Sequence, residues 1–157
     1  TAEGEIIGLF LRERIPPRLS PEETIAAIRA QGGVVYVPHP FDRVRSEAMG
    51  QRTLERIVDR VDAIEVFNAR VLMAGDNVRA LEFAQAHGLA MGAGSDAHTP
   101  YELGRAYVEI DSFHDPVSFL AALRRGCVGG ALSSPFIHAV TTAIRLCRPF
   151  LGRPAAG

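Results

Sequence analysis

Several side chains that could bind a metal ion stand within, or just after, short apolar runs of the chain. The runs cover residues 34–38, 63–67 and 90–94. The polar side chains that they carry or lead into are His39, Glu65, Asn68, Asp96 and His98. Imidazole and carboxylate groups are ligands that Zn²⁺, Mn²⁺ and Fe²⁺ take in proteins. The pattern therefore predicts a divalent-metal hydrolase site built from three separate stretches of chain.

Strands and helices that alternate along the chain are needed to bring these stretches together. Buried parallel strands are predicted by short, continuous apolar runs at about 6–11, 34–38, 63–67, 90–94 and 106–110. Val35, Ala63 and Met91 follow one another at intervals of 28 residues, close to the length of one strand and one crossover helix. Because the carboxyl ends of parallel strands meet at one edge of a sheet, we expect the polar side chains to gather there.

Helical patterns fill the gaps between the apolar runs. They cover residues 21–31, 47–61, 71–87, 115–125 and 134–148. Ser20-Pro21 joins an N-cap oxygen to a proline at the first helical position, and Ser20 with Glu23 fits a capping box. The alternation of strands and helices predicts an α/β fold, either a barrel or an open sheet.

The turn Pro38-His39-Pro40 and the loop behind it carry further candidate groups. A proline on each side restricts the backbone around His39, so the imidazole loses less entropy when it binds a metal. Asp42, Arg43 and Arg45 come next, and an arginine fork beside a metal site suits phosphate oxygens. The same charges are also typical of a solvated loop, and both interpretations stay open.

The composition argues against several classes of protein. The 157 residues, 47% of them hydrophobic, are enough for one domain with a core. The net charge of −1 provides no basic field that would hold nucleic acid over the whole surface. Cys127 and Cys147 are the only cysteines, which indicates a reducing, cytoplasmic compartment rather than a disulfide scaffold. Because no long apolar run is present, we expect neither a membrane span nor a signal peptide.

Three segments resemble the polymerase-and-histidinol-phosphatase (PHP) family. They are the Pro38-His39-Pro40 turn, the run Ala63–Asn68 with its Glu-x-x-Asn, and the run Gly94–Thr99 with its Ser-Asp-x-His-Thr. The resemblance covers roughly residues 1–145. It implies a distorted seven-stranded β/α barrel, of which this chain would form the carboxyl-terminal portion. It also implies two or three divalent metal ions (Mn, Zn or Fe) and hydrolysis of phosphate esters, from phosphomonoesters and nucleotides to short oligonucleotides.

The resemblance implies a set of metal ligands. His39, Asp96 and His98 match family ligands, and Asp96 and His98 are expected to serve catalysis directly. Glu5 stands where many members have a histidine ligand, and a carboxylate there is still able to bind metal. The family's opening His-x-His motif has no counterpart in the chain. We therefore expect the chain to be the carboxyl-terminal two-thirds of a longer domain, with part of the ligand set.

Three other residues are expected beside the metal ligands. Glu65 and Asn68 match a motif at the rim of the family's barrel and would contact the substrate or support the ligands. Arg43 is expected to hold a phosphate oxygen. The expected partner is therefore a small phosphate ester or a short oligonucleotide, and no pattern indicates an oligomeric state.

The predicted domain covers residues 1–148, with 110–148 as its helical extension and 149–157 as a tail or linker. Two other functions stay open. The chain could be a catalytically inactive PHP-like structural or interaction module, since Glu5 replaces the usual histidine and the opening motif is missing. It could also be an amidohydrolase-like enzyme that cleaves C–N bonds, although all 17 basic residues are arginine and no lysine could bridge two metals.

Overall fold

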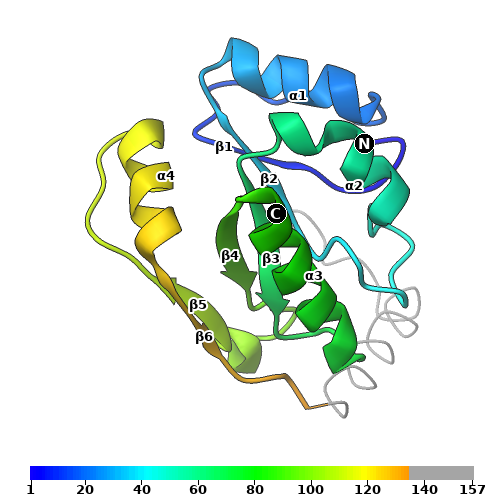
Figure 1. Ribbon diagram of the computed structural model, residues 1–157, viewed down its shortest axis with the longest axis vertical. Coiled ribbons are helices and arrows are strands. Elements are labelled where there is room, and N and C mark those ends of the chain that lie inside the picture. Colours follow the sequence, from blue (N-terminus) through cyan, green and yellow to red (C-terminus); the bar gives the residue numbers. More distant parts are fainter. Residues whose placement is uncertain (135–157) are drawn as a thin grey trace, which may run out of the picture.

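A four-stranded sheet with helices on both faces forms the main part of the computed structural model (Figure 1). The structure describes residues 1–134. In chain order its elements are β1 (Ile7–Leu9), α1 (Pro21–Ala30), β2 (Val34–Val37), α2 (Gln51–Ile57), η1 (Val58–Arg60), β3 (Ala63–Asn68), α3 (Ala74–His87), β4 (Ala90–Gly94), η2 (Pro100–Glu102), β5 (Ala106–Glu109), α4 (Pro116–Arg125) and β6 (Cys127–Gly130), where η marks a 3₁₀ helix. This succession makes a mixed α/β fold, as the sequence predicts.

Within residues 1–134 the main sheet is open, with the strand order β1-β2-β3-β4. β2, β3 and β4 run parallel, with Tyr36 opposite Ala63 and Ala63 opposite Ala90. β1 runs antiparallel to β2, with Ile7 opposite Tyr36. The prediction of a parallel strand near the start of the chain is therefore wrong; β1 is an antiparallel edge strand, a common addition to a parallel sheet. Consequently the amino end of β1 lies at the same edge as the carboxyl end of β2.

Apolar side chains pack against both faces of the sheet. Alternation along β2 sends Val35 and Val37 to one face and Tyr36 to the other. The first face packs against α1, α2 and α3; its buried layer includes Ile25, Ile28, Val35, Val37, Leu54, Ile57, Ile64, Val66, Ala80 and Ala84. The second face packs against α4 and β5, through Tyr36, Ala63, Ala90, Val108, Phe119 and Leu123. Figure 1 shows α4 on the other side of β4 from α3.

Local signals decide where the helices begin. α1 has the predicted capping box, in which Ser20 Oγ accepts from the Glu23 N–H at 3.2 Å and Glu23 accepts from the Ser20 N–H at 2.9 Å. α2 begins at Gln51, later than predicted, because Gly50 has a φ of 74°, outside the helical region. The apolar pattern alone does not reveal that turn.

β5 and β6 form a separate, two-stranded antiparallel sheet. The sequence predicts β5 as a further parallel strand, which is wrong, and does not predict β6. Ser95 Oγ ties β5 to the end of β4, since it accepts from the Ala106 N–H and donates to the Ala106 carbonyl, both at 3.1 Å. The predicted helix over 134–148 and the tail 149–157 lie outside the described residues, apart from Ser134. No helix within residues 1–134 has the length and apolar character needed to cross a membrane.

Candidate metal centre

The candidate ligands gather at the edge of the sheet where β2, β3 and β4 end. His39 follows β2, Glu65 lies within β3, and Asp96 follows β4. Glu5 precedes β1, whose antiparallel direction brings it to the same edge. Side chains from four strands therefore approach one another, as expected for the carboxyl edge of a parallel sheet.

Glu65 is a buried carboxylate at this edge. Its Oε2 accepts hydrogen bonds from the His39 N–H and from Asn68 Nδ2, both at 2.8 Å. Gly94 leaves room for it, because a Cβ at Gly94 would collide with Glu65 Oε1. Burial raises the pKa of the Glu65 carboxyl; the hydrogen bonds from Asn68 and His39 oppose this rise, and the charge of Asp96 adds to it. A buried carboxylate that is also subject to a second negative charge favours a cation nearby.

His39 combines an unusual backbone conformation with a buried ring. Its φ is 29°, a region that few non-glycine residues adopt. Its Nε2 lies 2.9 Å from Glu5 Oε2. Its Nδ1 is buried and has no hydrogen-bond partner within residues 1–134. Strained backbone and buried polar atoms that lack partners both concentrate at functional sites.

The loop after β4 presents Asp96 and His98 at the rim. Asp96 also has a positive φ, of 48°. His98 Nδ1 lies 2.8 Å from the Asp96 carbonyl oxygen. Because a carbonyl only accepts, this contact puts the proton on Nδ1 and leaves the lone pair on Nε2. Imidazoles oriented in this way are common among metal ligands.

Glu102, which is not among the predicted site residues, holds this loop in place together with Arg70. The fully buried Glu102 Oε2 accepts from the N–H of His98 at 3.0 Å and from the N–H and Oγ1 of Thr99 at 2.9 and 3.0 Å. Its Oε1 pairs with Arg70. Burial raises the pKa of Glu102, but these hydrogen bonds and Arg70 outweigh it and bring the pKa below its ordinary value. The capping-box spacing from Thr99 to Glu102 is a sequence signal that could have identified this network.

Asn68 is oriented by Asn77, a second residue that the sequence does not single out. The Asn68 N–H donates to Asn77 Oδ1, and Asn77 Nδ2 donates to the Asn68 carbonyl, both at 3.1 Å. Asn68 Oδ1 accepts from the Arg70 N–H at 2.8 Å, which aims Nδ2 at Glu65. In the sequence, Asn77 resembles any polar residue on the first turns of a helix.

The two arginines of the loop after β2 take different places. Arg43 Nε donates to Asp76 Oδ1 at 2.8 Å near the start of α3, and the Arg43 side chain is 59% exposed. Arg45 points among the candidate ligands, where it pairs with Asp96 Oδ2 and its Nη1 lies 3.4 Å from His39 Nε2. The structure thus brings Arg45, rather than Arg43, to the ligand group.

The group is chemically suited to a divalent cation, but its side chains do not enclose one as they stand. Imidazole nitrogen and carboxylate oxygen are ligands of Zn²⁺, Mn²⁺ and Fe²⁺, and the buried His39 ring has a nitrogen that lacks a partner within residues 1–134. No three His, Cys, Asp or Glu side chains in that part of the chain converge closely enough to hold an ion. The Arg45 guanidinium lies among them. The residues therefore suit a metal ion by their chemical type, and the Arg45 guanidinium supplies the positive charge beside Asp96 and His39.

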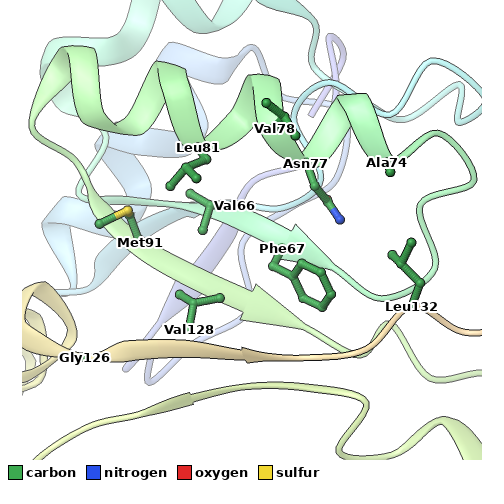
Figure 2. A pocket seen from close by; sticks show the side chains of 10 residues that line it. All are labelled: Val66, Phe67, Ala74, Asn77, Val78, Leu81, Met91, Gly126, Val128 and Leu132. Carbon is green, nitrogen blue, oxygen red and sulfur yellow. The ribbon is translucent and has the colours of Figure 1, made fainter.

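Cavities adjoin the sheet within residues 1–134. One, of about 390 Å³, lies on the α4 side and is lined by Glu65 and by apolar side chains of β1, β2, β5 and α4. Another, of about 520 Å³, lies between α3 and β6 (Figure 2). Figure 2 shows that its walls are mainly apolar, and none of its lining residues is titratable; they are Val66, Phe67, Ala74, Asn77, Val78, Leu81, Met91, Gly126, Val128 and Leu132. Only the first of these two cavities reaches the ligand group.

Comparison with known sequences gives a family and two relatives. Residues 74–128 match the family model described as PHP-associated. The uncharacterized protein MJ0417 of Methanocaldococcus jannaschii is 40% identical over 117 residues, which cover 73% of this chain and 49% of that protein. The uncharacterized protein MJ1587 of the same organism is 54% identical over 69 residues, which cover 44% of this chain and 38% of that protein. The chain thus spans about half the length, or less, of these relatives.

Solved structures share the arrangement of the chain. A candidate metal-dependent phosphoesterase from Bifidobacterium adolescentis is 28% identical with a TM-score of 0.50, over 76% of this chain and 41% of that one. PsfC from Pseudomonas syringae shows likeness of fold alone, at 20% identity and a TM-score of 0.60, over 87% of this chain and 55% of that one. A two-domain protein of Bacteroides vulgatus that contains a predicted PHP-like metal-dependent phosphoesterase also shows likeness of fold alone. It is 17% identical with a TM-score of 0.57, over 80% of this chain and 40% of that one. The match of residues 74–128 to the PHP-associated model and the likeness to the Bifidobacterium protein support the resemblance of the chain to the PHP family.

Proposed function

We propose that this protein hydrolyses phosphate esters at a divalent-metal centre on the carboxyl edge of its sheet. The observation that carries the proposal is the contact of His39 with two carboxylates, since its N–H donates to Glu65 and its Nε2 lies 2.9 Å from Glu5 Oε2, while the charge of Asp96 acts on Glu65. The match of residues 74–128 to the PHP-associated model and the likeness to a candidate metal-dependent phosphoesterase support the same chemistry. We further propose that the sheet is part of a β/α barrel domain that spans residues 1–148.

Four side chains are the proposed metal ligands, namely His39, Asp96, His98 and Glu5. When bound there, two or three Mn, Zn or Fe ions would polarise the phosphate and lower the pKa of a water molecule. Asp96 and His98 are the proposed catalytic ligands, because both are partly exposed at the rim where an ester would arrive. Glu65 and Asn68 position His39 through the hydrogen bonds that meet at Glu65 Oε2.

The proposed substrate is a phosphomonoester, a nucleotide or a short oligonucleotide. Arg43 is the proposed phosphate contact, since its guanidinium is largely exposed on the loop that also carries His39. The cavity that reaches Glu65 is walled by Tyr36, Phe119 and aliphatic side chains. Such walls suit a flat, apolar group attached to the phosphate.

A catalytically inactive PHP-like module is the second candidate function. It is favoured by the ion pair between Arg45 and Asp96, which neutralises a proposed ligand without a metal. A module of this kind would keep the fold and the buried Glu102 network while it lacked metal-stimulated hydrolysis. Activity with added metal therefore separates the two candidates.

The test measures hydrolysis of p-nitrophenyl phosphate and bis(p-nitrophenyl) phosphate by the full-length protein with Mn²⁺. We expect His98→Ala to lower kcat/KM by about 100-fold or more, because a metal ligand has been removed. The matched control is His114→Ala, since the His114 side chain is 85% exposed before α4, and we expect an unchanged rate. Equal rates for His98→Ala and wild type would contradict the ligand assignment. Wild-type protein that shows no Mn²⁺-stimulated hydrolysis would favour the inactive module.

A further inference from the structure

Arg45 places a positive charge among the proposed metal ligands. Its Nη2 pairs with Asp96 Oδ2, its Nη1 lies 3.4 Å from His39 Nε2, and its Nε lies 3.6 Å from Asp42 Oδ2. The Arg45 side chain is 24% exposed and that of Asp96 is 19% exposed. In this position the guanidinium offsets carboxylates that would otherwise repel one another in a poorly hydrated site.

The position of Arg45 gives His39 two conflicting contacts at one nitrogen. His39 Nε2 lies 2.9 Å from Glu5 Oε2 and 3.4 Å from Arg45 Nη1. The carboxylate needs a proton on Nε2, whereas the guanidinium needs a lone pair there. One nitrogen cannot offer both at once. A divalent cation bound to that lone pair and to the Glu5 carboxylate would satisfy the imidazole and the carboxylate together. Its charge would repel the Arg45 guanidinium.

We propose that Arg45 is a built-in competitor of the divalent cation. Its guanidinium holds Asp96 when no ion is bound, and it leaves when an ion binds Asp96 and His39. The inference rests on the proposed function, since it concerns how the same site is regulated. Its consequence is a lower affinity for metal than the ligand set alone would give.

The surroundings of Arg45 allow this exchange. The residue lies in the irregular loop between β2 and α2, and water reaches both members of its pair with Asp96. The pair of Arg70 with Glu102 is different, because those side chains are only 7% and 0% exposed. A partly hydrated pair on a loop costs less to open than a buried pair.

The test is binding of Mn²⁺ to the full-length protein, measured by isothermal titration calorimetry for wild type and Arg45→Gln. Glutamine removes the charge but keeps a polar side chain. We expect Arg45→Gln to bind Mn²⁺ about tenfold more tightly, because no charge-assisted pair has to be opened. The matched control is Arg52→Gln, which removes the same charge from an exposed position of α2. The affinity of this variant for Mn²⁺ should stay within about twofold of wild type, because salt screens the charge of the replaced arginine.

The outcomes separate this inference from the proposed function. If Arg45→Gln binds Mn²⁺ no more tightly than wild type while Asp96→Asn loses binding, the competition is overturned and the metal site stands. If wild type and every variant fail to bind Mn²⁺, both are overturned. An equal gain in Arg52→Gln would overturn the competition as well, because the loss of one positive charge from the protein would then explain it.

A second measurement uses wild-type protein and does not depend on how a variant folds. The arginine Nε–H signals are followed by nuclear magnetic resonance during a titration with Zn²⁺. We expect the Arg45 signal to move toward that of a hydrated guanidinium at stoichiometric Zn²⁺, while the Arg70 signal keeps its position. An Arg45 signal that does not respond to saturating Zn²⁺ would overturn the proposal.

Discussion

Glu102 and Glu65 are buried glutamates beside the same edge of the sheet, but their pKa values shift in opposite directions. Glu102 accepts three hydrogen bonds from the loop after β4 and pairs with Arg70, so its pKa lies below the ordinary value despite burial. Glu65 accepts hydrogen bonds from His39 and Asn68 and lies near Asp96, and here burial dominates and raises the pKa. Glu102 therefore completes a closed structural network, whereas Glu65 is a carboxylate whose charge is costly until a cation approaches.

Glu102→Ala should be the most damaging change at this edge. It removes the carboxylate partner of Arg70 and the acceptor of the His98 and Thr99 N–H groups. We expect the free energy of unfolding to fall by about 3–5 kcal/mol, as when one member of a buried ion pair is removed. Urea denaturation measures the change.

The pH dependence and a control sharpen this prediction. Because the folded-state pKa of Glu102 is lowered, its contribution to stability is present above the unfolded-state pKa and is lost as pH falls through the folded-state pKa. The gap between wild type and Glu102→Ala should therefore narrow in acid. Glu82→Ala, at an exposed position of α3, should change stability by less than about 0.5 kcal/mol. Equal losses of unfolding free energy in Glu102→Ala and Glu82→Ala would contradict the structural role of Glu102.

Gly94→Ala should disturb the other carboxylate. The added Cβ would collide with Glu65 Oε1 and push the carboxylate away from the His39 N–H and Asn68. We expect a loss of about 1–3 kcal/mol, the usual cost of overpacking, measured by thermal or urea denaturation. Gly75→Ala is the matched control, because no atom lies within 4 Å of a Cβ built there in α3. Gly75→Ala should leave stability unchanged or raise it by up to about 1 kcal/mol. A Gly94→Ala variant that behaves in the same way would contradict the conclusion that Gly94 leaves room for the Glu65 carboxylate.

The sequence predicts the parallel part of the fold better than its edges. β2, β3 and β4 are continuous apolar runs at an even interval, and such runs depend on burial on both faces. The direction of β1 depends on pairing across the sheet, and its apolar run does not encode that direction. The start of α2 depends on the φ of one residue, Gly50, which hydrophobic periodicity does not register.

The candidate site shows the same division. The convergence of His39, Glu65 and Asp96 follows from their places after or within neighbouring strands, so it could be predicted. Which arginine of the loop after β2 turns inward depends on side-chain direction, and the sequence offers Arg43 and Arg45 equally. The roles of His39, Asp96, His98 and Glu5 as metal ligands, and of Arg43 as a substrate contact, stay predictions.

Glu65→Gln should have the smallest effect on stability, with the opposite sign. A glutamine oxygen can accept the same two hydrogen bonds without a charge that burial and Asp96 disfavour. Because the folded-state pKa of Glu65 is raised, its contribution favours folding below the unfolded-state pKa and is lost as pH rises through the folded-state pKa. At pH 7 we expect metal-free Glu65→Gln to be more stable than wild type by about 1 kcal/mol in urea denaturation, and the gain should vanish in acid.

Added Mn²⁺ should oppose this gain, since a ligand that binds the folded state stabilises it in proportion to affinity. Loss of the Glu65 charge weakens the attraction of the site for a cation, so saturating Mn²⁺ should stabilise wild type more than Glu65→Gln.

Asn77→Ala is the control that disturbs the support of Asn68 and leaves the charge of Glu65 in place. It should destabilise the protein at neutral and acidic pH alike, because no titrating group is changed. If Glu65→Gln instead loses stability at pH 7 with or without Mn²⁺, then Glu65 is a structural carboxylate like Glu102, and the charge of the site has to be assigned to Asp96 and Glu5 alone.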